Sequence, residues 1–203
     1  MAPSIGTQHP DWVPFIKKGA AEWNAIGSTM QFAYAGVAPD EGDCGTAAGL
    51  GIVRHRFIPP ENGDFFPAHA WFCYVGERPV SFVMELNTAA RWYAGALDPG
   101  ANEFDVWAVA SHEFGHVTGW GAAHYDAAPD AGVLCDEGSQ QKHTMCPSIA
   151  TSNQRMRTLE AHDIGTFNNA YPVPTPDPIC SIDPTAASTT ENETRPLDLN
   201  ICY

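Results

Sequence analysis

The sequence has few basic residues, no long apolar segment and no Cys-x-x-Cys pair. Only 10 of its 203 residues are Lys or Arg, against 24 Asp and Glu, so the formal net charge is −14. Such a surface repels phosphate backbones and anionic lipids, which argues against nucleic acid and membrane surfaces as partners. No apolar stretch approaches the roughly 20 residues that a membrane-spanning helix needs.

The six cysteines are compatible with three disulfide bonds, because their number is even. Without a Cys-x-x-Cys pair, a zinc ribbon or a thioredoxin-like site is disfavoured. We favour pairing between neighbours along the chain: Cys44 with Cys73, Cys135 with Cys146, and Cys180 with Cys202. The alternative is six buried free thiols in a cytosolic protein.

Three features favour an exported, extracellular protein. Lysine is scarce, the C-terminal segment is rich in Thr and Pro, and Asn192-Glu193-Thr194 is a glycosylation-type triplet. The first residues, up to Trp12, lack the basic and then apolar regions of a signal peptide. We therefore expect a mature form with an added Met1.

The hydrophobic pattern predicts a mixed α/β domain over residues 1–172 and a Pro/Thr-rich tail over residues 173–203. Helical spacing of apolar residues and short apolar stretches between turn residues mark the elements. The expected helices are 11–24, 102–119 and 158–171, and the expected strands are 30–35, 51–58, 69–75 and 80–86. The tail has no core of its own, and a Cys180–Cys202 bond would close a loop in it.

The motif that carries chemistry lies in the helix predicted over residues 102–119. Residues four apart share one face of a helix, so His112 and His116 can present two imidazole nitrogens to one metal ion. Glu113 is about 100° around the helix from His112, where its carboxylate can take a proton from a water on that metal. Zinc suits such a site and lowers the pKa of its water toward about 7. The simpler alternative is that the two histidines lie on a polar helix face and bind no metal.

Gly119 follows His116 by three residues, and Met145 lies downstream in Thr144-Met145-Cys146-Pro147. This HExxHxxG pattern with its later methionine resembles the metzincins, a family of zinc endopeptidases, and residues 158–171 resemble the closing helix of the matrixin branch. The resemblance implies a twisted, mixed, mostly parallel sheet of four to five strands with N-terminal, active-site and C-terminal helices. It also implies that Gly119 ends the active-site helix and that Met145 lies beneath the zinc.

The third histidine of the family pattern is displaced in this chain. The pattern places it three residues after Gly119, where this sequence has Ala122, and the nearest histidine is His124. A turn enlarged by two residues can bring His124 to the zinc. Spacing and ligand preference favour His124 over Asp126 and the more distant His143.

A second metal site is not expected. His69 and Asp64 resemble two ligands of the matrixins' structural zinc, but Asn62 stands where its first histidine would be. Two ligands do not hold a structural zinc. Calcium is compatible with the number of carboxylates, but no EF-hand-like spacing supports it.

Together these features predict a secreted, monomeric zinc endopeptidase that cleaves a protein or peptide substrate. Glu113 is the expected general base, and His112, His116 and His124 are the expected zinc ligands. Two alternatives stay open. Glu137 as third ligand would make the protein a gluzincin-like hydrolase, and a vestigial site would make it a zinc-stabilised binding module.

Overall fold

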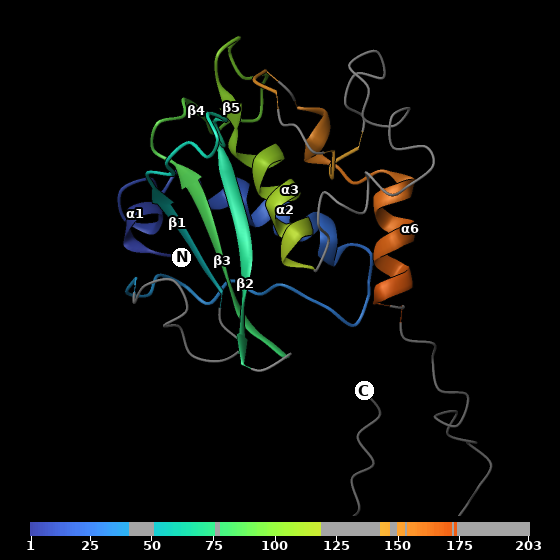
Figure 1. Ribbon diagram of the computed structural model, residues 1–203. Helices are drawn as coiled ribbons and strands as arrows, with labels where there is room; N and C mark the ends of the chain where they lie inside the picture. The colour runs from blue at the N-terminus through green and yellow to red at the C-terminus, as the bar shows by residue number, and fades with distance from the viewer. Residues whose placement is uncertain are drawn as a thin grey trace, which may run out of the picture.

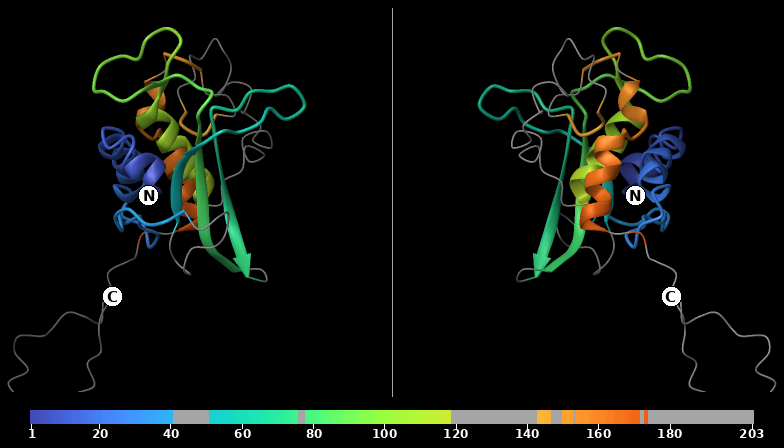
Figure 2. Two further views of the ribbon diagram at one scale, coloured as in Figure 1. Left: turned by 90° about the vertical axis from the view of Figure 1, so that its left-hand side faces the viewer. Right: turned by 90° about the vertical axis from the view of Figure 1, so that its right-hand side faces the viewer.

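The computed structural model describes residues 1–40, 51–75, 78–118, 143–146, 150–152, 154–171 and 173, and this part of the chain is a mixed α/β structure. Figures 1 and 2 show the helices on one side of a small sheet. The elements are α1 Pro3–Gly6, α2 Val13–Asn24, β1 Ile52–Arg56, β2 Ala68–Val75, β3 Arg78–Asn87, β4 Trp92–Tyr93, β5 Phe104–Asp105, α3 Val106–Val117, the 3-10 turn η2 Arg155–Arg157, and α6 Ala161–Ala170.

The main sheet has the strand order β1-β3-β2. Strand β1 pairs parallel with β3, with Val53 opposite Met84, and β2 pairs antiparallel with β3, with Phe72 opposite Phe82. Strands β4 and β5 form a separate parallel pair. The main sheet is therefore mixed, as expected, but within the described residues it has three strands rather than four to five.

The expected strand Met30–Ala35 joins neither sheet, so that prediction is wrong. The side chain of Asn24, at the end of α2, binds both backbone groups of Phe32. Its Nδ2 donates to the Phe32 carbonyl at 2.8 Å, and its Oδ1 accepts from the Phe32 N–H at 2.7 Å. Since these are the groups that a neighbouring strand would need, an amide side chain replaces the strand partner here.

Two helices begin later than the sequence indicates. Helix α3 begins at Val106 rather than near residue 102, because Phe104–Asp105 pairs with β4 and the Asp105 carboxylate caps the helix. Helix α6 begins at Ala161, because Glu160 and Asp163 form a capping box. Thr158, the expected cap, is extended.

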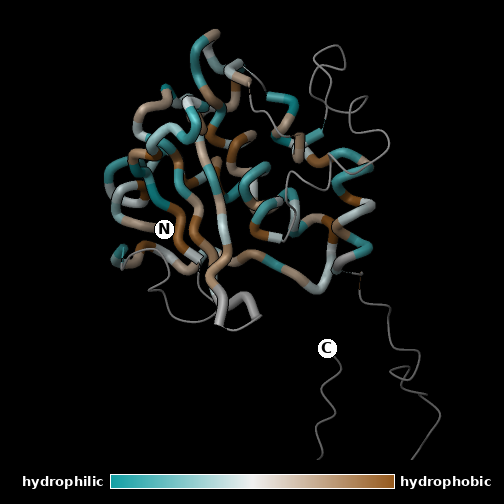
Figure 3. Tube along the Cα trace, in the orientation of Figure 1, coloured by the Kyte–Doolittle hydropathy of each residue, from teal (hydrophilic) through white to brown (hydrophobic). Residues whose placement is uncertain are grey.

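The core lies between the helices and the sheet. Figure 3 shows hydrophobic residues along β1, β3 and α3. Helix α2 packs directly on α3, and the buried Trp23 donates from Nε1 to the Ser111 carbonyl at 2.8 Å. The fully buried members of this core include Ile5, Ile16, Met84, Leu86, Val106, Val109, Ala110 and Phe167.

The close approach of α2 and α3 depends on Gly19. A Cβ on this residue would lie 2.7 Å from the Ser111 nitrogen and 2.9 Å from Ala110 atoms. We expect Gly19→Ala to lower the free energy of unfolding by about 1–3 kcal/mol, because the added methyl must push the helices apart. Chemical denaturation of the purified protein measures this loss.

Gly165, in the exposed part of α6, is the matched control. Nothing lies within 4 Å of a Cβ placed there, so Gly165→Ala gains helix propensity without a clash and adds about 0.5–1 kcal/mol. Equal responses of the two variants would contradict the close helix packing.

Candidate metal centre

Helix α3 places His112 and His116 on one face, as their spacing predicts. The two rings meet edge to face with centroids 4.6 Å apart, and their Nε2 atoms are 2.9 Å apart. His112 is 4 % exposed, and His116 lies closer to the surface. The two nitrogens therefore converge on one point at the edge of the helix.

The carbonyl of Thr144 orients His112. His112 Nδ1 lies 2.6 Å from this oxygen, and because a carbonyl only accepts, Nδ1 carries the proton. Nε2 then has a lone pair and faces His116. A backbone carbonyl behind a histidine is the arrangement that fixes metal-binding imidazoles in one tautomer.

This geometry fits a zinc ion. Two nitrogens at zinc-bond length in a tetrahedral site are about 3.3 Å apart, so the observed pair must open by only a few tenths of an ångström. Burial lowers the pKa of His112 to about 3, His116 adds to the lowering, and the Thr144 hydrogen bond opposes it. His112 is therefore neutral at physiological pH, which is the form that binds metal.

Glu113 is buried next to this pair. It is 2 % exposed, and burial raises the pKa of its carboxyl to about 8. Its Oε2 atom has no hydrogen-bond partner within the described part of the chain. A buried carboxyl oxygen without a partner is costly, and a cation with its water at the histidine pair would supply both a partner and a compensating charge.

The expected third ligand lies outside the described residues. His124, the expected ligand, and the alternatives Asp126 and Glu137 all lie outside them, as does Gly119. No set of three His, Cys, Asp or Glu suited to a metal occurs in the described ranges. His143 is described, and its ring lies 6.0 Å from that of His162.

Met145 packs on helix α3 between the two histidines, at Gly115. It is 1 % exposed, and its Sδ atom is so close to Gly115 that a Cβ there would overlap it. The methionine that sequence analysis singled out therefore packs directly on the helical turn that separates His112 from His116. Glycine at position 115 is required for this contact.

Helix α6 and Tyr171, which follows it, contact both Thr144 and the end of α3. Asp163 Oδ2 accepts from the backbone N–H groups of Thr144 and Glu160, each at 3.1 Å. Tyr171 donates its hydroxyl to the Thr118 carbonyl at 2.8 Å, just past the end of α3. Thr144, whose carbonyl orients His112, is thus itself fixed by a carboxylate.

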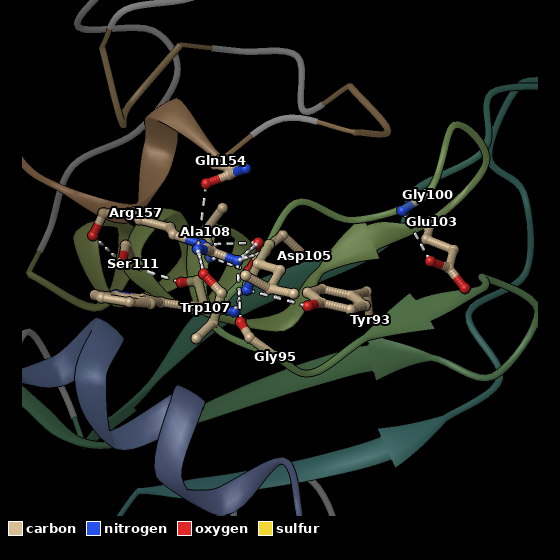
Figure 4. Close-up of polar contacts among 12 residues, drawn as sticks. Tyr93, Gly95, Gly100, Glu103, Asp105, Trp107, Ala108, Ser111, Gln154 and Arg157 are labelled. Carbon is tan, nitrogen blue, oxygen red and sulfur yellow. Dashed lines mark hydrogen bonds and ion pairs between the residues drawn. The ribbon is translucent and has the colours of Figure 1, made fainter.

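Sequence reasoning missed a buried ion pair that supports the start of α3 (Figure 4). Arg157 is 7 % exposed, and its Nε donates to Asp105 Oδ2 at 2.8 Å. Its other nitrogens bind the carbonyls of Gly95, Ala96 and Leu97. The second oxygen of Asp105 caps α3. An Asp before an apolar helix is a recognisable capping signal, but nothing local in the sequence points to Arg157.

Arg157 also contacts the residue before His112. The Ser111 hydroxyl lies 3.1 Å from both the Arg157 carbonyl and the Trp107 carbonyl.

Arg157→Ala leaves the Asp105 carboxylate buried and unpaired, so we expect a loss of about 3–5 kcal/mol in the free energy of unfolding, measured by denaturant titration.

Arg155, exposed in the same turn, gives the control for Arg157. Arg155→Ala removes a positive charge at the surface, where screening limits the loss to about 1 kcal/mol or less. A comparable loss in both variants would contradict the supporting role of the buried ion pair.

The residues that resemble a structural zinc site have other contacts. His69 Nε2 lies 2.8 Å from Glu85 Oε2, and the same carboxylate pairs with the buried Arg54. The backbone of Asp64 pairs with that of Glu61 in a tight turn. His69 thus belongs to an ion-pair cluster on the sheet.

Cys73 and Cys146, the two described cysteines, are each disulfide-bonded. Cys44, Cys135, Cys180 and Cys202 lie outside the described residues, so the three expected pairings stay predictions.

No family model matches the chain, and no curated protein matches it either. None of the helices in the described ranges is long and apolar enough to cross a membrane.

Proposed function

We propose that the protein is a secreted zinc-dependent endopeptidase with a metzincin-like fold. The observation that carries the proposal is the pair of Nε2 atoms 2.9 Å apart with a buried carboxyl on the adjacent residue. His112 and His116 would hold the ion, with His124 as third ligand. Two imidazoles and an open position are the donor set of a hydrolytic zinc site.

When bound, zinc supplies a water of lowered pKa and polarises the scissile carbonyl. Glu113 takes the proton from the attacking water at Oε2, the atom that has no other partner among the described residues. Beside a bound zinc ion the pKa of this buried carboxyl would fall, so that Glu113 is ionised, accepts the proton and then passes it to the leaving amine. Burial excludes bulk water from this transfer.

Strand β2 supports an extended peptide as the substrate. It lies at one edge of the described sheet, since among the described strands it pairs only with β3, and it packs against α3. A peptide added along this edge would satisfy its own backbone hydrogen bonds and bring one peptide bond toward the histidine pair.

The two disulfide-bonded cysteines support export. Disulfide bonds form and persist in oxidising compartments and are rare in the cytosol.

The ligand set is tested by measuring zinc after dialysis against buffer without metal. We expect one zinc per wild-type chain and its loss in His112→Ala, His116→Ala and His124→Ala, because each removes one of three protein ligands. His69→Gln, which alters an imidazole paired with Glu85, keeps the metal.

Asp126→Ala and Glu137→Ala complete the ligand series. Retention of zinc in both supports His124, and its loss in Glu137→Ala would make the site gluzincin-like instead. A wild-type chain that neither contains nor takes up zinc would overturn the proposal.

The role of Glu113 is tested with Glu113→Gln, which keeps the size of the side chain but removes the base. Zinc stays bound, and the cleavage rate of a reduced, alkylated protein substrate falls by about 10²–10⁴-fold. Glu61→Gln, at an exposed turn far along the chain, is the control and keeps its activity.

Full turnover by Glu113→Gln would contradict the role of this carboxyl. A zinc-loaded wild-type protein that cleaves no unfolded substrate would instead favour a zinc-stabilised binding module.

A further inference from the structure

A cavity of about 340 Å³ lies between α2, the segment 31–35 and the sheet. Its size is at the lower end of the roughly 300–1,000 Å³ that small-molecule sites occupy. Three phenylalanine rings form much of its wall: Phe32, Phe82 and Phe114. The Phe32 and Phe114 rings have centroids 4.8 Å apart, and Ile16 and Val53 are among the other apolar residues of the lining.

The cavity exists because segment 31–35 does not pair as a strand. Asn24 binds the backbone of Phe32 and thereby holds the segment against the end of α2. At the opposite wall, Gly51 lets the Phe82 ring lie directly on the backbone, since a Cβ there would overlap the ring. The hydrogen bonds between Asn24 and Phe32 thus border the cavity, and an apolar occupant leaves them intact.

The cavity is separate from the histidine pair. Its wall residue Phe114 is two residues from both His112 and His116, which is about 160° around α3 from each, so it faces the other side of the helix. An occupant of the cavity therefore does not need the metal.

Lys17 gives the cavity a positive mouth. Among the described lining residues it has the one charged side chain, and no Asp or Glu is among them; the N-terminal ammonium of Met1, which donates to the Gly36 carbonyl at 2.8 Å, is a second cation. Its Nζ lies 5.1 Å from the centre of the Tyr34 ring, which also lines the cavity. In a chain of net charge −14, a partly apolar hollow whose described charged groups are both cationic favours an apolar ligand with a negative head.

We infer that this cavity binds a free medium-chain alkyl carboxylate, with its chain against Phe32, Phe82 and Phe114 and its carboxylate at Lys17. The acid is free rather than part of a bilayer, because the net negative charge of the molecule opposes contact with an anionic lipid surface. This inference does not rest on the proposed peptidase activity.

The test is isothermal titration of the full chain with hexanoate, octanoate and decanoate below their micelle concentrations, in the presence of a chelator. We expect saturable binding to one site, tightening about three- to fourfold for each methylene buried. Octanoate should bind about two- to fivefold tighter than 1-octanol, because only the acid pairs with the exposed Lys17 ammonium.

Lys17→Gln should remove the difference between the acid and the alcohol. Lys18→Gln is the matched control, since it loses the same charge from the next residue of α2. The Lys18 ammonium lies 4.4 Å from the centre of the Trp107 ring, and Lys18 does not line the cavity. This variant keeps the full difference.

Ala21→Phe tests the location of the alkyl chain. Ala21 is exposed on α2 and lines the cavity, so the larger ring fills the hollow with little effect on the core. We expect octanoate affinity to fall more than about tenfold. Ala25→Phe, one turn further and not in the lining, keeps the wild-type affinity.

Three results would overturn the inference: no saturable binding of any of the acids, equal affinity of acid and alcohol for the wild type, or unchanged affinity in Ala21→Phe. Loss of binding when the chelator is added would place the carboxylate at the metal site instead. If Ala21→Phe does not fold, the test is the affinity difference between octanoate and 1-octanol in Lys17→Gln and Lys18→Gln. Loss of this difference in Lys17→Gln alone supports the inference, and its persistence in Lys17→Gln contradicts it.

Discussion

The burial of helix α3 is the constraint on which the rest of the structure depends. Ten of its twelve residues are buried, including the polar Ser111, His112 and Glu113. Because a buried polar group without a partner is costly, Ser111 and His112 bind groups of other segments. Trp23 and Arg157 contact Ser111, the Thr144 carbonyl contacts His112, and Arg157 pairs with the capping Asp105. These contacts draw α2, the 143–146 segment and η2 around one helix.

The same burial prepares the helix for chemistry. It lowers the pKa of His112, so that the imidazole keeps its lone pair, and raises the pKa of Glu113, so that the carboxyl retains a proton. In water Glu113 would be ionised at neutral pH and His112 would be mostly neutral; in this site burial favours the neutral form of both groups when no cation is present. The Oε2 atom of Glu113 is left without a partner in the described structure, in contrast to the side chains of Ser111 and His112.

Much of the local structure could be predicted from the pattern of residues. Strands β1, β2 and β3 and helix α2 lie within a few residues of their expected positions, because strand and helix periods are local properties. The prediction failed at Met30–Ala35, whose alternating apolar residues resemble a strand. The Asn24 side chain, eight residues earlier, occupies the backbone of Phe32 instead. A single side-chain contact of this kind leaves no periodic trace.

The spacing of His112, Glu113 and His116 by itself determined that two imidazoles share a helix face beside a carboxyl, since 3.6 residues make a turn in any α-helix. Tertiary structure alone decided which nitrogen of His112 faces outward, that Met145 packs on Gly115, and that Arg157 supports the start of α3. Those contacts join residues 32 and 52 positions apart, for His112 with Thr144 and for Arg157 with Asp105. Local periodicity extends over a few turns, and only the folded chain brings such distant groups together.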